Sequence, residues 1–177
     1  MRIALLRAAL STVGWPSVDI RPFDPADADA LWTLLEPVFR AGDTYAVDPN
    51  ISRDAALAMW VDTPAATYVV EDAGAILGTY YIKTNQAGGG AHVCNCGYIT
   101  AAAARGQGLA SAMCAHSLGA AKALGYKAMQ FNFVLTSNEG AIRLWERAGF
   151  ETVGRIPEAF QHPSAGLVDA LVMYRKL

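Results

Sequence analysis

Residues 95–110, NCGYITAAAARGQGLA, decide the fold that we predict: they read as a strand, a short turn and the opening of a helix. The turn is residues 105–110, with the pattern R-x-x-G-x-A. Glycine lets the backbone approach a ligand without an obstructing Cβ atom, and the first N–H groups of a helix attract anions. The turn therefore predicts a pyrophosphate site, to which Arg105 adds a permanent positive charge.

Three types of phosphate-binding loop share this strand-turn-helix arrangement. A Walker loop needs G-K-[ST], and neither Lys nor Ser follows Gly108 in that pattern. A dinucleotide fingerprint needs a third glycine and an acidic residue about 20 residues later, and both are missing. The remaining type is the glycine-rich turn of acetyl-CoA enzymes. A glycine-rich loop that only caps a helix is the structural alternative.

Length and composition indicate one folded domain. The chain has 177 residues, of which 53% are hydrophobic and 17% charged, enough for a substantial core. The net charge of −2 and the lack of a Lys/Arg run argue against nucleic acid or a membrane as partner. Three cysteines make no disulfide framework and fit a reducing cytosol, so we expect a cytoplasmic protein.

Two parts of the chain are expected. Residues 1–17 begin like a signal peptide, but Arg7 interrupts a short apolar run, so we interpret them as an N-terminal extension. Residues 18–177 predict the order β-α-α-β-β-β-α-β-α-β-β, a mixed α/β sheet with helices on both faces. Asp24, Ser52 and Asn138 are the expected helix caps. The helix of the glycine turn is predicted over 106–124, a second helix through Trp60, and the closing strands over 152–156 and 167–174.

Two markers carry a resemblance to a known family. RGQGLA at 105–110 and NEGAIRLWERAGF at 138–150 stand at the spacing of the GNAT N-acetyltransferases, which residues 18–177 resemble. Within that family, LGTYYIK, NCGYI, LGYKAMQFNFV and VDALVMYRK are similar to the fungal enzymes that acetylate azetidine-2-carboxylate and other proline-like imino acids. The resemblance implies the GNAT fold, an α/β (α+β) architecture with a mostly antiparallel mixed sheet and splayed central strands. It also implies transfer of acetyl from acetyl-CoA to an amine.

The resemblance further implies how acetyl-CoA is bound. Backbone groups of the central strand would contact the pantetheine and the acetyl carbonyl, and one N–H would stabilise the oxyanion. Asn138 matches the family Asn that holds the CoA arm near its thiol, and it is also an expected helix cap. The predicted cofactor-binding residues are Tyr98, Ile99, Thr100, Arg105, Gly106, Gln107, Gly108, Leu109, Ala110 and Asn138.

Two departures from the family pattern bear on the chemistry. Trp145 stands where many members have a Tyr that protonates the departing thiolate, and an indole N–H is a poor acid. The central strand lacks the common Glu base. Asn95, and Asn132 on the next strand, cannot take a proton at neutral pH but can orient an acceptor; two satisfied core amides are the structural alternative. We therefore predict a water-mediated base.

The predicted site is completed by the loop between the first two helices. Tyr45 and Asp48 are candidates for substrate contact there, with a solvated loop as the alternative. His92, Cys94 and Cys96 share a strand face without a fourth ligand, so no metal is expected. The predicted catalytic residues are Asn95, Asn132 and Asn138, and the predicted substrate-binding residues are Tyr45, Asn95 and Asn132.

The function predicted from the sequence is acetyl-CoA-dependent N-acetylation of a small amine, with amino and imino acids as candidate acceptors, by direct attack. Family analogy alone suggests a homodimer. The alternative is a non-catalytic CoA-binding sensor or interaction domain on the same fold.

Overall fold

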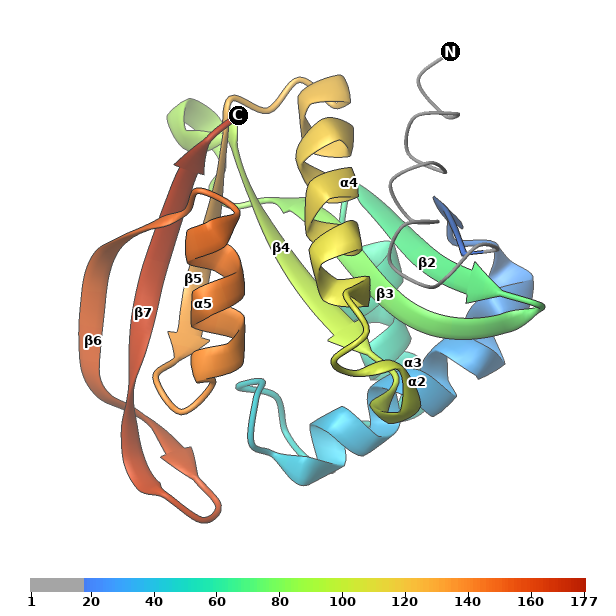
Figure 1. Cartoon of the computed structure of the whole chain (residues 1–177), viewed down its shortest axis with the longest axis horizontal. Helices are drawn as coiled ribbons and strands as arrows, with labels where there is room; N and C mark the ends of the chain where they lie inside the picture. Colours follow the sequence, from blue (N-terminus) through green and yellow to red (C-terminus); the bar gives the residue numbers. More distant parts are fainter. Residues whose placement is uncertain (1–17) are drawn as a thin grey trace.

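The computed structural model describes residues 18–177, and the predicted extension, residues 1–17, lies outside them. Within the described part, the strands form one seven-stranded sheet in the order β1-β2-β3-β4-β5-β7-β6 (Figure 1). The strands are β1 (Asp19–Pro22), β2 (Ala66–Asp72), β3 (Ala75–Thr84), β4 (Val93–Thr100), β5 (Ala128–Leu135), β6 (Glu151–His162) and β7 (Gly166–Lys176). Only β4 and β5 pair in parallel, so the predicted, mostly antiparallel mixed sheet is confirmed.

Helices cover both faces of this sheet, as predicted. The helices are α2 (Ala28–Ala41), α3 (Arg53–Leu57), α4 (Leu109–Ala123) and α5 (Glu139–Arg147). Figure 1 shows α4 and α5 on the near face and α2 and α3 behind the sheet. Over residues 18–177, no helix combines the length and the apolar character that a membrane crossing requires.

The three predicted helix caps are confirmed. The Asp24 side chain accepts a hydrogen bond from the Ala26 N–H at 2.9 Å and caps the 3-10 turn Pro25–Asp27 before α2. The Ser52 hydroxyl accepts from the Ala55 N–H at the start of α3. The Asn138 amide oxygen accepts from the N–H three residues later, at the start of α5. Each cap satisfies a helix N–H group that has no partner within its helix.

Several predicted boundaries are wrong, each for a physical reason. The helix of the glycine turn begins at Leu109, because Gly106 and Gly108 have φ values of +74° and +83°, outside the helical region. Before them, Ala102–Ala104 form a 3-10 turn. The second helix ends at Leu57 and continues as a wider π-helical turn. The closing strands are longer than predicted because β6 and β7 pair with each other beyond two bulges.

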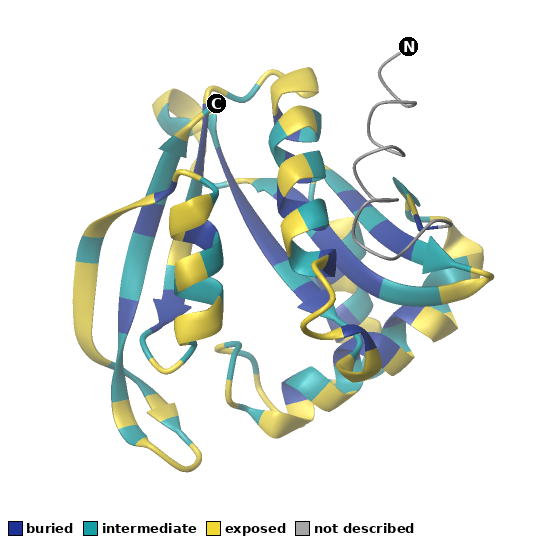
Figure 2. Ribbon diagram, in the orientation of Figure 1, coloured by how far each residue is buried: buried dark blue, intermediate teal, exposed yellow. Residues whose placement is uncertain are grey.

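Two hydrophobic cores hold the helices to the sheet. On the α4 and α5 side, Met113, Phe131 and Trp145 pack with the strands; on the other side, α2 and α3 pack around Leu35 and Trp60. Figure 2 shows most of β4 buried, whereas β6 is largely exposed. The central strand is therefore fixed by packing on both faces.

The strands β4 and β5 separate soon after they meet. They pair only through Val93 with Ala128 and through Cys94 with Met129. Beyond these residues β5 keeps its pairing with β7, and the two central strands diverge in Figure 1. The predicted splay is confirmed, and it leaves one edge of β4 without a neighbouring strand.

Candidate active site

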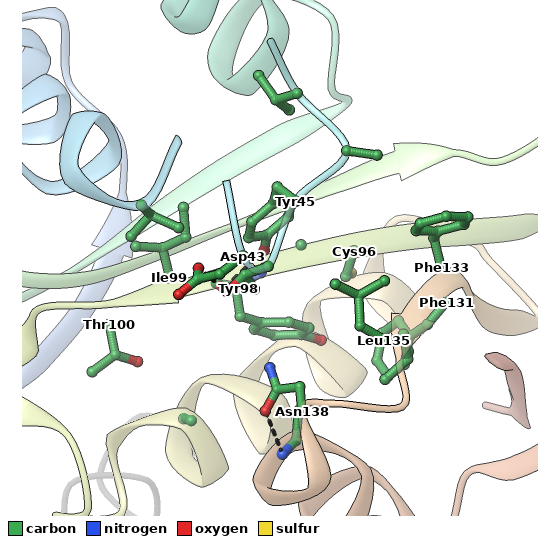
Figure 3. A pocket seen from close by; sticks show the side chains of 18 of the residues that line it. Asp43, Tyr45, Cys96, Tyr98, Ile99, Thr100, Phe131, Phe133, Leu135 and Asn138 are labelled. Atoms are coloured by element: carbon green, nitrogen blue, oxygen red, sulfur yellow. Dashed lines mark hydrogen bonds between the residues drawn. The ribbon is translucent and has the colours of Figure 1, made fainter. Parts of the chain in front are cut away.

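A cleft of about 980 Å³ occupies the gap between β4 and β5. It is lined from both faces of the sheet, and Figure 3 shows part of its lining. Near the glycine turn and α5 it is lined by Tyr98, Thr100, Arg105, Gly106, Asn138 and Trp145. Toward α2 and the loop after it, the lining includes Asp43, Tyr45, Tyr81, Lys83 and Asn95, and His162 lines the cleft from the end of β6. The cleft thus joins the predicted cofactor residues to the predicted acceptor residues.

The pairing of β3 with β4 determines which backbone groups face the cleft. The Ala101 N–H donates to the Leu77 carbonyl at 2.8 Å, and the Asn85 N–H donates to the Val93 carbonyl at 2.9 Å. Alternate residues of an antiparallel strand bond to the same neighbour, so residues 95, 97 and 99 also face β3. Of the three predicted backbone contacts, Tyr98 and Thr100 therefore face the gap, and Ile99 is turned toward β3.

The predicted substrate residue Tyr45 lies directly on this free edge. Its hydroxyl donates to the Tyr98 carbonyl at 2.8 Å and accepts from the Tyr98 N–H at 2.9 Å. In Figure 3 its ring enters the cleft from the loop after α2 and points at Tyr98. The ring packs edge-on against Phe39 and Trp60, and burial raises the pKa of the phenol, which stays protonated. Asp48, the other loop candidate, is exposed and accepts from the Asn50 N–H.

The glycine turn has the geometry and charge that an anion requires. A Cβ atom at Gly106 would meet nothing within 4 Å, so the backbone there is open to a ligand. Gly108, at the N-cap of α4, has no side chain that could accept from the helix, so the first N–H groups of α4 suit an outside acceptor. Arg105 is exposed and makes no ion pair with any described residue. Gln107 donates to the Ala103 carbonyl at 2.8 Å, and Leu109 is buried, so both hold the turn in place.

The structure brings the two predicted amides, Asn95 and Asn132, to the same cleft. Asn95 is 7% exposed, donates to the Gln130 carbonyl at 2.9 Å and accepts from the Tyr81 hydroxyl at 3.2 Å. Asn132 is exposed, donates to Asn85 at 2.6 Å and accepts from Gln130 at 2.7 Å. An amide has two N–H groups and two lone pairs, so each keeps capacity for a further partner. Their roles toward an acceptor stay predictions.

Asn138 and Trp145 reach the cleft from α5. In Figure 3 the Asn138 oxygen is bonded to the helix, and its amide nitrogen points toward Tyr98. Trp145 is buried, with its ring 4.9 Å from that of Tyr98 and 4.8 Å from that of Phe131. The Tyr98 hydroxyl lies 2.7 Å from that of Ser117, so it is held by α4. Trp145 therefore fills its position as a packing residue.

Among the residues on the acceptor side that sequence reasoning missed are Lys83 and Gly97. Lys83 is half-buried directly opposite Asn95 in the β3–β4 register, with its ammonium 5.6 Å from the Tyr81 ring and no ion pair among the described residues. The period-2 alternation of Tyr81 and Lys83 could have indicated their shared face. Gly97 makes room for the Tyr81 ring, because a Cβ atom there would lie 2.6 Å from it. No local sequence signal reveals that contact.

Comparison with known proteins identifies the family. The family model of the acetyltransferase (GNAT) family matches residues 28–150. A GCN5-related N-acetyltransferase from Kribbella flavida is 38% identical with a TM-score of 0.86, over 91% of this chain and 98% of that one. A phosphinothricin acetyltransferase from Sinorhizobium meliloti, solved in complex with acetyl-CoA, shares the fold (TM-score 0.80, 20% identity, 91% of this chain and 89% of that one).

A curated relative matches over a shorter range. The N-acetyltransferase aca1 of Schizosaccharomyces pombe is 34% identical over 108 residues, 60% of this chain. The chain spans about half, 52%, of that relative's length. The extent of the family match and the fold agree with the resemblance read from the two sequence markers: the chain belongs to the GNAT acetyltransferase family.

Proposed function

We propose that this chain transfers the acetyl group of acetyl-CoA to the amine of a small molecule, with amino and imino acids as acceptors. The observation that carries the proposal is the cleft between β4 and β5, which runs from an open anion-binding turn to a set of polar side chains. Acetyl-CoA as co-substrate is supported by the family and by the acetyl-CoA complex of a protein with the same fold.

The cofactor side of the cleft fits the parts of acetyl-CoA. Arg105 and the free N–H groups at the start of α4 suit the pyrophosphate, because both present positive charge to one open turn. The gap-facing N–H and C=O groups of Thr100 suit the amides of the pantetheine arm, as an added strand would, and the Tyr98 N–H suits the carbonyl oxygen of the thioester. In Figure 3 the Asn138 amide nitrogen points toward Tyr98, so it suits a further contact with the pantetheine arm.

The proposed reaction is a direct transfer without an acyl-enzyme. The amine lone pair forms the new C–N bond to the acetyl carbon while the C–S bond breaks. The amine loses one proton, and the departing thiolate gains one. The side chains of Asn95 and Trp145 can perform neither transfer, so water is the proposed proton carrier. The cleft contributes by holding both reactants in place, which can supply much of the rate.

The acceptor side supports a substrate that carries a carboxylate. Lys83 provides a half-buried positive charge with no ion pair among the described residues, and Asn95 and Asn132 add amide groups nearby in the same cleft. A carboxylate satisfies an ammonium and an amide N–H at once, through charge-assisted hydrogen bonds. An amino or imino acid joins such a carboxylate to the amine that is acetylated.

A thiol-release assay tests this proposal. Acetyl-CoA is offered with a panel of amines that includes azetidine-2-carboxylate, L-proline and amines without a carboxylate, and free CoA is measured. Release with the carboxylate-bearing acceptors is expected, and Arg105→Glu should weaken acetyl-CoA binding at least tenfold. Release only with amines that lack a carboxylate would refute the acceptor class. Tight acetyl-CoA binding with no CoA release in the presence of any amine would refute the proposed catalytic activity and favour a non-catalytic CoA-binding module.

A further inference from the structure

The free edge of β4 already has a partner at its centre. The N–H and C=O groups of Tyr98 face the gap, and the Tyr45 hydroxyl binds both, at 2.9 and 2.8 Å. A backbone N–H donates one good hydrogen bond, so this donor is in use in the ligand-free chain. Tyr45 belongs to the acceptor loop, residues 42–52, between α2 and α3. One contact therefore joins that loop to the strand proposed to receive the acetyl group.

The contact between Tyr45 and Tyr98 lies where an extended thioester would pass along β4. On one side of Tyr98, the bond from Asn95 to the Gln130 carbonyl marks where β4 and β5 begin to separate. On the other side, β4 ends at Thr100 and the anion-binding turn follows. A thioester that extends from the turn along β4 meets the Tyr98 N–H within the gap. Its carbonyl oxygen and the Tyr45 oxygen cannot both accept from that one donor.

We propose that the Tyr45 hydroxyl and the carbonyl oxygen of a bound thioester compete for the Tyr98 N–H, so that thioester binding releases Tyr45 and its loop from β4. The inference rests on the proposed function, since it places acetyl-CoA in this cleft. Tyr45 is then a positioning residue: the acceptor loop is bonded to β4 when no acetyl group is bound and is released when one is. CoA without the acetyl group lacks the competing oxygen and leaves the contact in place.

The structure contains the means for this exchange. The loop follows α2 at Gly42, whose φ of +60° places it in the left-handed C-cap conformation. Tyr45 keeps its proton because burial raises the pKa of its phenol, so the released hydroxyl remains both a donor and an acceptor. Its ring contacts are with Phe39 and Trp60, which belong to the same side of the sheet. Phe39 and Trp60 lie outside the loop, so they keep their places when the Tyr45 hydroxyl leaves Tyr98.

The variant Tyr45→Phe tests the competition, because it removes the hydroxyl and keeps the ring. Isothermal titration calorimetry measures the Kd of acetyl-CoA and of CoA for wild type and variant. In the variant, acetyl-CoA no longer has to displace the two hydrogen bonds between Tyr45 and Tyr98. Its binding should therefore tighten about tenfold, and CoA binding should stay unchanged. Tyr80→Phe is the matched control: it removes a buried hydroxyl from the neighbouring strand, bonded to His116 and outside the cleft, and should change neither Kd.

Hydrogen exchange on the wild-type chain provides a second test that needs no variant. Acetyl-CoA should accelerate exchange in residues 42–52, and CoA should not. Equal loop exchange with both ligands, or a Tyr45→Phe variant that binds acetyl-CoA no more tightly than wild type, would overturn the inference. A thermal-shift control separates the two proposals: no stabilisation by either ligand refutes acetyl-CoA binding itself, whereas stabilisation by both without a loop difference refutes only the competition.

Discussion

Replacement of Gly97 by alanine tests how the acceptor side of the cleft is packed. A Cβ atom at Gly97 would lie 2.6 Å from Cε1, 3.0 Å from Cζ and 3.1 Å from the hydroxyl oxygen of Tyr81. The 2.6 Å separation is shorter than real Cβ contacts and the other two are tight, so the Tyr81 ring has to move. Its displacement breaks the 3.2 Å hydrogen bond to Asn95 and the edge-to-face contact with Trp60 at a centroid distance of 4.8 Å.

The expected loss of stability follows from these two contacts. The hydrogen bond is worth about 1 kcal/mol and the aromatic pair about 0.5–1.5 kcal/mol. Replacing glycine by alanine also lowers the conformational entropy of the unfolded chain, which stabilises the folded state by about 0.4–1 kcal/mol. The net change is a loss of about 1 kcal/mol, and ring displacement in a packed site can raise it to about 3 kcal/mol. For a chain of this size that corresponds to a fall in Tm of roughly 2–12 °C.

Thermal and urea unfolding of matched variants measure this loss. Gly119→Ala in the interior of α4 is the control, because its Cβ atom meets nothing within 4 Å. It should raise stability by about 0.5–1 kcal/mol. In a Tyr81→Leu background, Gly97→Ala should cost much less than in the wild type, since the clashing ring is gone. A Gly97→Ala variant as stable as wild type, or an equal cost in both backgrounds, would refute the packing argument.

Three further predictions concern single side chains. Asn138→Ala should cost about 1 kcal/mol in urea unfolding, because α5 loses its cap, while Asn138→Asp should keep it; equal stability of the two variants would contradict this. Lys83→Met should raise the KM for azetidine-2-carboxylate about tenfold without changing that for acetyl-CoA, and Lys83→Arg should restore it; unchanged KM values would exclude a carboxylate contact. Burial lowers the pKa of His116 from 6.5, so the unfolded chain binds more protons and stability should fall as pH decreases below 6.5; His116→Phe should flatten that part of the curve, and an equally steep variant would contradict the assignment.

Structural features that depend on residues close together in the chain were predictable from the sequence. The caps at Asp24, Ser52 and Asn138 each depend on a polar side chain and an N–H two or three residues away. Alternating apolar residues gave the strands, and the glycine turn gave the strand-turn-helix unit at the centre of the fold. The boundary of α4 was missed because sequence does not show that Gly106 and Gly108 both adopt positive φ.

Features that depend on register and distant packing were not predictable. The bonds between Tyr45 and Tyr98 join residues 53 positions apart, and the bond from Asn95 to Gln130 spans 35. The resemblance to the GNAT family predicts Tyr45, Asn95 and Asn132 as substrate-binding residues. Their hydrogen-bond partners follow only from the divergence of β4 and β5. Which backbone groups of Tyr98 and Thr100 face the gap likewise depends on the pairing of β3 with β4.

The two departures from the family pattern make sense as parts of one packing arrangement. Asn95 donates to the Gln130 carbonyl and accepts from Tyr81, and so joins β4 to β5 where their ladder ends. A carboxylate at this position could accept but not donate, and it would bury a charge beside an unpaired carbonyl.

Trp145 in turn fills the space between Tyr98 and Phe131, so a hydroxyl there would replace buried contact area with a polar atom that needs a partner. Asn95 and Trp145 thus hold neighbouring strands and rings together, and neither side chain can exchange a proton. The proton transfers of the proposed reaction therefore fall to water.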